Sequence, residues 1–365
     1  MRILVAMSGG VDSSVVAALL HEQGHEVIGA TLQLYDHGAA IQKKGACCAG
    51  QDIHDARRVA DHLGIAHYVL DREERFRRAV IQDFADTYAR GETPIPCIRC
   101  NQTVKFQDLL ELAEDMGCEA MATGHYAQAR PGPELHMAAD PARDQSYFLA
   151  HTTRAQLART LFPLGGMASK AEVRAHAARL GVAVAEKPDS QDICFVPSGS
   201  YADVVQKFRP EALAPGEIVD GQGRVLGEHR GIARYTVGQG RGIGVAAAER
   251  LYVHSVDAGR RRVVVGPRPA TEAIMVGELN WLVTPARGEF RADIKLRARE
   301  APHPASLWLE GDVLHVRPDT PAVAAPGQAC VVYEQGRVLG AGFIRGRPRV
   351  DSEAPAAYLP PSAVV

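Results

Sequence analysis

Residues 3–14 read ILVAMSGGVDSS, an apolar run that passes through two glycines into a second apolar segment. Ile3–Met7 predicts a short buried strand, and Val11–Leu20 predicts a helix directly behind the glycines. A glycine turn between a strand and a helix lets backbone amides and the helix N-terminus hold an anion. The spacing is neither the dinucleotide fingerprint nor a Walker loop. A phosphate site and a plain glycine turn with a Ser or Asp helix cap are therefore both open.

Strand-like and helix-like stretches continue to alternate in the N-terminal half of the chain. Further strands are expected at Val27–Leu34, His67–Leu70 and Ala120–Thr123, and further helices at Asp52–Leu63, Phe76–Tyr88, Val104–Met116 and Lys170–Leu180. This alternation predicts a doubly wound parallel sheet, because parallel neighbours need crossover connections. Ligands of such sheets bind at the carboxyl ends of the strands, which places a site beside Ser8–Ser13.

After about Pro210 the pattern changes to short Val-rich runs separated by Gly and Pro. This texture is typical of small β modules, either sandwiches or barrels. We therefore expect an α/β domain at 1–208, a small β domain at 209–275, a barrel-like β domain at 276–350 and a tail at 351–365.

The composition excludes several classes of protein. The 365 residues are 46% hydrophobic and 23% charged, which is ordinary for a globular chain. No run reaches the roughly 18 apolar residues of a membrane span, and the N-terminus lacks the pattern of a signal peptide. We therefore expect a cytoplasmic protein without a membrane partner. Secreted, fibrous and disordered classes are excluded as well.

Charge is distributed unevenly along the chain. Residues 1–223 carry 22 basic and 29 acidic side chains, a net charge of −7, whereas residues 224–350 carry 19 and 12, a net charge of +7. The C-terminal part is thus the better candidate for contact with a polyanion. An ordinary solvated basic surface would show the same excess.

Three of the seven cysteines stand in chemically suggestive places. Cys97 and Cys100 form a CxxC pair on a proline-framed loop, with Asn101 as the expected cap of the following helix. A cysteine at a helix N-terminus beside Arg99 is expected to favour its thiolate. Cys194 ends a polar loop. A nucleophilic or redox pair, a zinc site with two distant ligands, and inert buried thiols all fit.

Ser8–Ser13 resembles the PP-loop of the ATP pyrophosphatase superfamily, and the wider sequence resembles bacterial-type tRNA-specific 2-thiouridylases over roughly residues 2–346. The strings that carry the second resemblance are Thr93–Phe106, Ala122–Tyr126, Asp144–Leu149, Asp189–Phe195, Tyr235–Gln239 and Pro326–Gln328. The resemblance implies an α/β plus β fold. Its N-terminal domain is a doubly wound parallel sheet of the adenine-nucleotide hydrolase type, followed by two small β domains, the last barrel-like.

The resemblance also implies a reaction, in which ATP adenylates O2 of the wobble uridine of tRNA and sulfur then replaces that oxygen. AMP and pyrophosphate are released. Cys194 corresponds to the persulfide carrier. Cys100 corresponds to the second catalytic cysteine, which attacks or resolves the persulfide and leaves a Cys100–Cys194 disulfide. Asp12 is the expected Mg²⁺ ligand. The implied partners are the anticodon arm of tRNA and a sulfur-donor or persulfide-relay protein.

The remaining site residues follow from the same resemblance. The implied ATP contacts are Ala6, Met7, Ser8, Gly9, Gly10, Val11, Asp12, Ser13, Leu32 and Gly124. The implied contacts to the target base or to tRNA are Ile95, Pro96, Cys97, His125, Arg143, Asp144, Gln145, Arg297, Arg299 and Gln328.

The chain departs from the family pattern where Ile95-Pro96 replaces Asn-Pro and where Arg143 replaces a lysine. Cys97 adds a third thiol, so Cys97, Cys100 and Cys194 could hold a [4Fe–4S] cluster as an alternative sulfur carrier. Two other classes stay open: a PP-loop ligase acting on a small metabolite, and a non-catalytic tRNA-binding or sulfur-relay protein. Pyrophosphate release by a metabolite ligase would not respond to tRNA, whereas tRNA would stimulate release by a thiouridylase. The intact PP-loop argues against the non-catalytic protein.

Overall fold

The computed structural model describes residues 1–35, 49–182, 184, 187, 193–196 and 200–346. Its N-terminal part is a five-stranded parallel sheet. In spatial order the strands are β3 (Ala66–Asp71), β2 (Glu26–Gln33), β1 (Arg2–Ala6), β4 (Ala120–Ala122) and β7 (Thr160–Leu161). Each expected strand is present within one or two residues of its predicted bounds.

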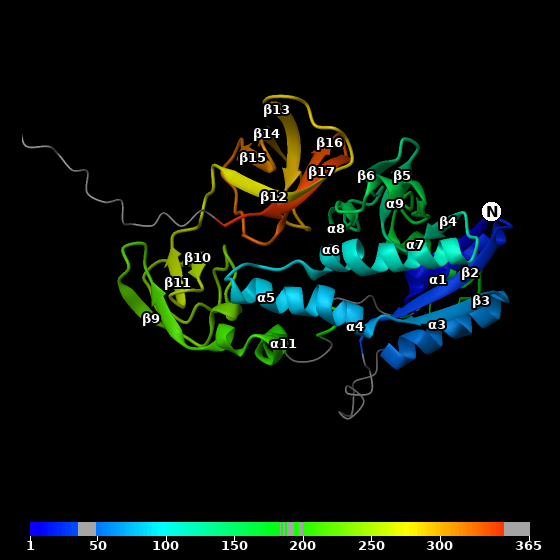
Figure 1. The fold of residues 1–365 in the computed structure, drawn as a ribbon, viewed down its shortest axis with the longest axis horizontal. Coiled ribbons are helices and arrows are strands. Elements are labelled where there is room, and N and C mark those ends of the chain that lie inside the picture. The colour runs from blue at the N-terminus through cyan, green and yellow to red at the C-terminus, as the bar shows by residue number, and fades with distance from the viewer. Residues whose placement is uncertain (36–48, 183, 185–186, 188–192, 197–199, 347–365) are drawn as a thin grey trace, which may run out of the picture.

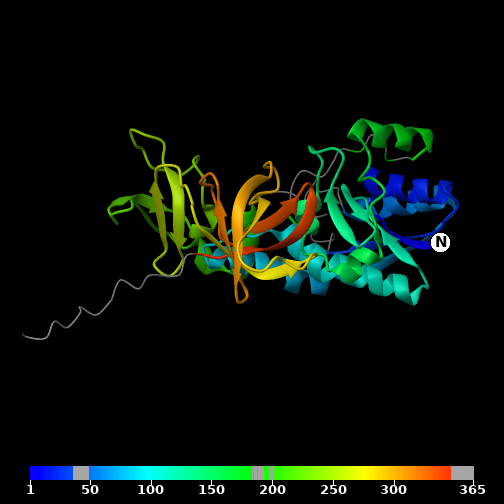
Figure 2. The same ribbon diagram turned by 90° about the horizontal axis from the view of Figure 1, so that it is seen from above.

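Helices cover both faces of this sheet (Figures 1 and 2). One face packs against α1 (Val11–Glu22), α3 (Ala49–Leu63) and α10 (Lys170–Arg179), and the other against α7 (Phe106–Asp115) and α9 (Arg154–Ala158). The predicted doubly wound architecture is therefore confirmed. Within the described residues, no helix is both long and apolar enough to cross a membrane.

Two helical runs are longer than the sequence pattern predicts. The first joins α4 (Glu73–Phe76), the π-type segment η1 (Arg77–Gln82) and α5 (Asp83–Ala89). The second joins α6 (Pro96–Cys100), the π-type segment η2 (Asn101–Lys105) and α7. Pro96 opens the second run, because a proline in the first helical turn loses no hydrogen bond. The remaining helical segments are α8 (Ser146–Leu149), α11 (Tyr201–Phe208), η3 (Pro210–Leu213) and η4 (Ile232–Arg234).

Asn101 is not the predicted helix cap. It lies inside the second helical run, where its buried side-chain amide donates a hydrogen bond to the carbonyl of Phe148 at 3.0 Å. The local sequence suggested a cap because asparagine is favoured there, but the helix had already begun at Pro96.

The C-terminal half forms two separate β structures. A four-stranded sheet has the order β10 (Tyr252–Asp257), β11 (Arg262–Gly266), β8 (Gly216–Val219), β9 (Val225–His229). The second sheet runs β12 (Ile274–Trp281), β15 (Val313–Pro318), β14 (His303–Glu310), β13 (Phe290–Lys295), β16 (Ala329–Glu334), β17 (Arg337–Ile344). Pairing of β12 with β17 closes these six strands into a barrel, which confirms the barrel-like expectation.

The barrel is joined to the parallel sheet by a common apolar core. A hairpin from the N-terminal half, β5 (Ala127–Arg130) and β6 (Glu134–Met137), extends the barrel sheet beside β17. Tyr147 of α8 is fully buried, and its hydroxyl donates to the carbonyl of Ala329 in β16 at 2.9 Å. Tyr333 of β16 lies in the same core as strand β4 and helix α7. Burial of large side chains on both partners holds the barrel in a fixed position beside the sheet.

Gly165 provides a test of this packing. A Cβ atom there would lie 1.7 Å from the carbonyl oxygen of Ala127 in β5, whereas a Cβ on Gly166 meets nothing within 4 Å. We expect Gly165→Ala to lower the free energy of unfolding by about 1–3 kcal/mol, which is the usual cost of overpacking. Gly166→Ala is the matched control and should stay close to wild type. Urea unfolding checks both variants, and equal stability of the two would contradict the packing described.

Candidate functional site

The glycine loop after β1 has a conformation that only glycine adopts readily. Gly9 has φ +71°, and a Cβ there would lie 2.1 Å from the carbonyl oxygen of Asp52 in α3. Gly10 is extended and precedes the first turn of α1. The two glycines therefore let the chain turn sharply into α1 while α3 packs against the turn.

Serine hydroxyls stabilise the loop from within. The hydroxyl of Ser13 accepts from the Ser8 amide at 3.1 Å and lies 3.2 Å from the Ser8 hydroxyl. Gly124, at the end of β4, packs so closely on α1 that a Cβ would lie 2.9 Å from the Ser13 amide nitrogen. The segment Ala6–Ser13 and Gly124 thus meet where β1 and β4 end, as the sequence predicted for a nucleotide site.

Two lysines that the sequence analysis did not single out contact this loop. Lys170 places its ammonium 2.7 and 2.8 Å from the carboxylate oxygens of Asp12, which also accepts from the Tyr126 hydroxyl at 2.7 Å. Lys187 donates to the carbonyl of Gly9 at 3.0 Å. The loop therefore has two cations in direct contact with it. Lys170 lies in the first turn of α10, where a positive charge is unfavourable because it opposes the helix dipole. A lysine at such a position is a sign of a functional role that could have been read from the sequence.

Lys187 also joins the loop to α3. Its ammonium lies 2.6 Å from Asp52 and 2.7 Å from Asp55. Burial by itself raises the pKa of Asp55, but hydrogen bonds from Lys187 and Gln51 outweigh that effect and hold this pKa below the usual value. Nothing in the local sequence announces this contact, because the partners are more than 130 residues apart.

The loop before α6 is held by the barrel. The amide of Thr93 donates to the carbonyl of Pro326 at 2.7 Å. The side-chain amide of Gln328 donates to the carbonyls of Thr93 and Pro94 at 3.2 and 3.1 Å. Gln328, predicted as a tRNA contact, therefore supports residues 93–96, which we call the cysteine loop because they lead directly into Cys97. Ile95 and Pro96, two predicted base contacts, lie on the same loop.

The three cysteines singled out from the sequence come together. Cys97 and Cys194 are exposed, Cys100 is buried, and all three are free thiols. Burial raises the pKa of both Cys100 and Cys194, and repulsion from the neighbouring thiolates, Cys97 included, adds to each shift, so the three thiols lie close together. Phe195 anchors the Cys194 segment, because its ring packs edge-on against Phe84 at 5.2 Å. Residues 189–192 of the predicted motif lie outside the described part of the chain.

Cys100 does not have the favoured thiolate that the sequence predicted. Burial raises the pKa of its thiol to about 11, and the ammonium of Lys105 only partly opposes this effect. Arg99, the expected activator, points instead toward Glu278 and Asp83, at 2.8 and 3.6 Å. The prediction failed because Cys100 ends α6 on its buried side.

Lys105 is the cation that influences these thiols. Its side chain interacts electrostatically with Cys97, Cys100 and Cys194. Burial lowers its pKa, but the three thiolates outweigh burial and raise it. Lys105 therefore stays an ammonium and favours the thiolate at Cys100 and Cys194. Among the described residues, no group of three His, Cys, Asp or Glu side chains has the arrangement of a metal site.

His125 follows Gly124 at the same sheet edge. Burial, with a smaller contribution from Lys105, lowers the pKa of its imidazole to about 3. The ring is therefore neutral at physiological pH, and its Nδ1 lies 2.9 Å from the Thr123 hydroxyl. A neutral imidazole in this place can accept or donate a hydrogen bond, but it is not a source of positive charge.

The predicted tRNA contacts at 143–145 differ from one another in their surroundings. The Asp144 side chain is only 1% exposed and lies 3.5 Å from the ammonium of Lys295 in the barrel. It also accepts hydrogen bonds from Ala138 and Ser146 at 3.1 Å. This carboxylate therefore holds the barrel in place and is not accessible to RNA. Gln145 accepts from the backbone amide of Tyr126 at 3.0 Å.

The basic residues predicted on the barrel are accessible. Arg297 and Arg299 are both exposed in the segment that follows β13. The Arg297 guanidinium packs over Gly238, where a Cβ would lie 2.8 Å from it. Arg297 thus lies between the barrel and the small β sheet, on the part of the chain that carries the positive charge.

Comparison with known proteins places this geometry in context. Three family models match in succession: the tRNA methyl transferase HUP domain at residues 1–198, the tRNA methyl transferase PRC-barrel domain at 202–267, and the aminomethyltransferase beta-barrel domain at 271–344. The tRNA-specific 2-thiouridylase MnmA of Acidiphilium cryptum is 64% identical over 94% of this chain and 100% of its own length. The MnmA of Cereibacter sphaeroides (ATCC 17023) is 58% identical, with 94% of each chain covered.

Likeness to solved structures is much weaker. A 4-thiouridine synthetase–RNA complex with bound ATP aligns over 57% of this chain and 50% of its own, at 16% identity and a TM-score of 0.35. That likeness is too low to support an argument about function.

The placement of the thiols predicts their reactivity. Iodoacetamide at pH 7 should label Cys97 and Cys194 at least about tenfold faster than Cys100, because the reagent reaches the two exposed thiols and does not reach the buried one. Lys105→Met should slow the labelling of Cys194, since its ammonium favours the thiolate; the exposed Lys207→Met is the matched control. Peptide mass spectrometry measures each rate. Labelling of Cys100 as fast as Cys194 would contradict the assignment.

Proposed function

The chain belongs to the family of tRNA-specific 2-thiouridylases, and from that premise we propose that it activates the wobble uridine with ATP before sulfur is inserted. As a member of the family, the protein is a tRNA sulfurtransferase that thiolates uridine. The finer steps proposed are adenylation of uridine O2 and displacement of AMP by sulfur. Adenylation supplies a good leaving group, which the carbonyl oxygen of uracil is not.

The glycine loop is proposed to hold the triphosphate of ATP. Backbone amides around Gly9 and Gly10, the N-terminus of α1 and the hydroxyls of Ser8 and Ser13 provide donors for phosphate oxygens. The ammonium of Lys170, within 2.8 Å of Asp12, supplies positive charge beside them. This lysine is the single observation that adds most to the motif, since it brings a cation to the loop from a distant helix.

Mg²⁺ fits the same loop only if Lys170 changes partner. Mg²⁺ is usually held by one or two carboxylates together with substrate phosphates, and Asp12 is the carboxylate in contact with the loop. In the structure Lys170 and Tyr126 occupy the oxygens of Asp12. We propose that the phosphates attract Lys170 and leave Asp12 for the ion, which would neutralise charge on the leaving pyrophosphate.

Sulfur is proposed to arrive as a persulfide on Cys194, which is exposed and therefore reachable by a donor protein. In one route its terminal sulfur attacks C2 of the adenylated uridine and AMP leaves. The Cys100 thiolate then attacks the Cys194 sulfur, so that the thiolated base is released and a Cys100–Cys194 disulfide forms. In the other route Cys100 attacks first and frees sulfide, which displaces AMP. Either route consumes two electrons from a thiol reductant to regenerate the cysteines.

Binding of the anticodon arm is proposed to involve both β modules, with domain boundaries near Phe208 and Met275. The excess of seven positive charges over residues 224–350 supports this assignment, because phosphate contacts supply much of the affinity for nucleic acids. His125, at the edge of the parallel sheet, and Ile95, on the cysteine loop, are the proposed contacts of the flipped target base.

Lys170 tests the nucleotide site. We expect Lys170→Met to raise the KM for ATP about tenfold or more, the usual size of a lost charged hydrogen bond. Lys170→Arg should recover part of that loss, and Lys207→Met should behave as wild type. The measurement is tRNA-dependent pyrophosphate release. An unchanged KM in Lys170→Met would remove this residue from the proposed site.

The cysteine roles are tested by Cys100→Ser and Cys194→Ser in an ATP-dependent thiolation assay, in which a persulfide-carrying donor protein supplies the sulfur and free sulfide is left out, because sulfide could displace AMP without either cysteine. Each variant should lose at least about a hundredfold in rate, because a serine hydroxyl does not form a persulfide or a disulfide. Cys118→Ser, whose thiol is buried far from the loop in sequence, is the control. Full activity in either catalytic variant would refute the assignment.

A [4Fe–4S] cluster on Cys97, Cys100 and Cys194 is the alternative sulfur carrier, and it would require these thiols to move, because in the structure they do not have the arrangement of a metal site. Anaerobic purification followed by iron analysis decides between the two. Iron-free protein that thiolates uridine supports the persulfide. Loss of activity together with iron supports the cluster.

A further inference from the structure

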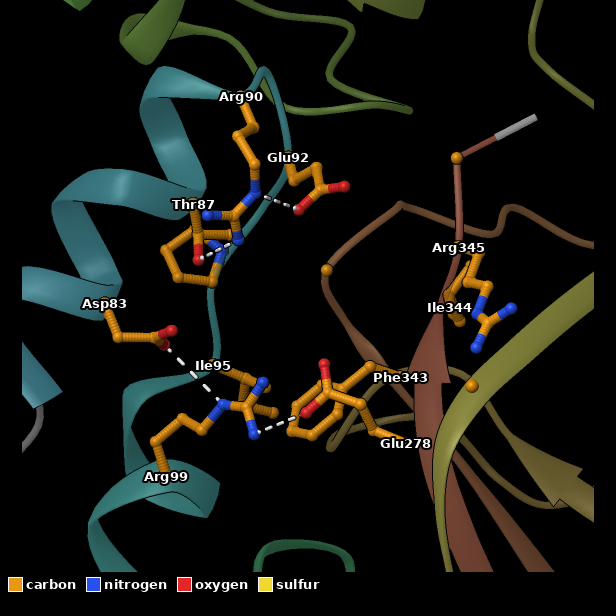
Figure 3. A pocket seen from close by; sticks show the side chains of 14 residues that line it. Asp83, Thr87, Arg90, Glu92, Ile95, Arg99, Glu278, Phe343, Ile344 and Arg345 are labelled. Carbon is orange, nitrogen blue, oxygen red and sulfur yellow. Dashed lines mark hydrogen bonds and ion pairs between the residues drawn. The ribbon is translucent and has the colours of Figure 1, made fainter. Parts of the chain in front are cut away.

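A cleft of about 190 Å³ lies beside the cysteine loop, between helix α5 and the barrel (Figure 3). It is lined by Asp83, Thr87, Arg90, Glu92, Pro94, Ile95, Arg99, Gly277, Glu278, Gly327, Phe343, Ile344, Arg345 and Gly346. Its volume is below the roughly 300 Å³ at which pockets begin to enclose a whole small-molecule ligand. The cleft therefore suits one unit of a polymer whose remainder lies outside.

The cleft shares a wall with the proposed reaction site. Ile95 lines it from the cysteine loop, and Arg99, which also lines it, stands between Cys97 and Cys100 in the sequence. Because Pro94 and Ile95 line the cleft and lead directly into Cys97, an RNA strand that crosses this loop to reach the cysteines passes beside the cleft.

The lining is suited to the edge of a base. Three guanidinium groups and three carboxylates face the same space, so that both donors and acceptors are available. A site for phosphate alone would be lined by cations and amides. Unpaired bases in RNA are recognised by hydrogen bonds to their edges and by stacking on aromatic rings or guanidinium planes.

Arg99 is already held as a stacking platform. Its guanidinium carbon lies 4.1 Å from the ring centroid of Phe343, and its nitrogens pair with Glu278 and Asp83 (Figure 3). Burial raises the pKa of Asp83, and the neighbouring arginines only partly compensate. This carboxylate would therefore gain from a further donor, such as the amino group of a base.

The barrel maintains strain at the rim of the cleft. Glu278 has φ +51°, a conformation that is uncommon for residues other than glycine, and the pairing of β12 with β17 is irregular at this point. Such strain costs of the order of 1–3 kcal/mol and is concentrated at ligand sites. Here it directs the Glu278 carboxylate to Arg99.

Arg345 is the cation best placed to receive a ligand. It is exposed, and in the described part of the chain no carboxylate lies within 4.0 Å of its guanidinium. The absence of a side chain at Gly277 makes room for it, since a Cβ there would lie 2.1 Å from the Arg345 Nε. Arg90, by contrast, is paired with Glu92 at 3.2 Å.

We propose that this cleft binds an unpaired nucleotide of the anticodon loop adjacent to the target uridine, with Arg345 contacting its base. The inference rests on the proposed function, because it takes the RNA strand to run across the cysteine loop. It adds a specificity subsite that reads a second position of the tRNA.

A double-mutant cycle on protein and RNA tests the subsite. The RNA is a synthetic anticodon stem-loop, either intact or with an abasic nucleotide on the 5′ or the 3′ side of the target uridine. Binding is measured by fluorescence polarisation, which does not depend on turnover. Arg345→Ala alters only an exposed side chain, and Arg179→Ala, an exposed arginine paired with Glu22 on α1, is the matched control.

We expect Arg345→Ala to weaken binding of the intact RNA about tenfold. For the wild-type protein, we expect one of the two abasic RNAs to bind more weakly than the intact RNA by a similar factor. Arg345→Ala should add little to that abasic defect. Three results would overturn the subsite. The first is that the loss of affinity from Arg345→Ala and the loss from the abasic nucleotide multiply at both abasic positions. The others are an unchanged Kd in Arg345→Ala and no binding of intact RNA by the wild type. Absence of thiolation from a sample that shows the expected cycle would count against the proposed function alone.

Discussion

The apolar core shared by the parallel sheet and the C-terminal barrel determines the position of the other functional parts. Tyr147 and Tyr333 lie in this core, and the buried Asp144–Lys295 pair is adjacent to it. A buried ion pair is a weak source of stability, but it fixes orientation, since either charge left alone would be costly. The barrel is thereby fixed beside the sheet, and Gln328 at its edge can hold the cysteine loop by two hydrogen bonds.

This arrangement separates two kinds of chemistry along one edge of the sheet. Around Gly9 the structure collects amides, hydroxyls and cations, which suit phosphate. Around Cys100 it collects apolar side chains and one cation, Lys105. The exposed Cys194 can be reached from solvent, whereas burial keeps Cys100 as a neutral thiol until a partner approaches. The difference in burial supports different roles for two residues of the same type.

Sequence reasoning succeeded where function depends on short-range pattern. The strand, glycine turn and helix over residues 2–22 were predicted almost to the residue, because their spacing is a local property. It failed where a side chain is directed by distant neighbours. Arg99 was expected beside the thiols and instead contacts Glu278 of the barrel. Asp144 was expected at the RNA and is instead buried against Lys295.

By itself, the sequence determined the fold class, through its periodicity, and the family, through strings of adjacent residues. The reactive residues that the family resemblance implies stay a prediction. Only the tertiary structure decided which charges meet. Lys170 reaches Asp12 across 158 residues, and Arg345 and Arg99 line one cleft although Arg345 follows strand β17 and Arg99 lies in helix α6. Electrostatic contacts act over a few ångströms of space and are independent of separation along the chain, so a local pattern can mark one charge, as the position of Lys170 at the start of α10 does, but not the partner that it meets.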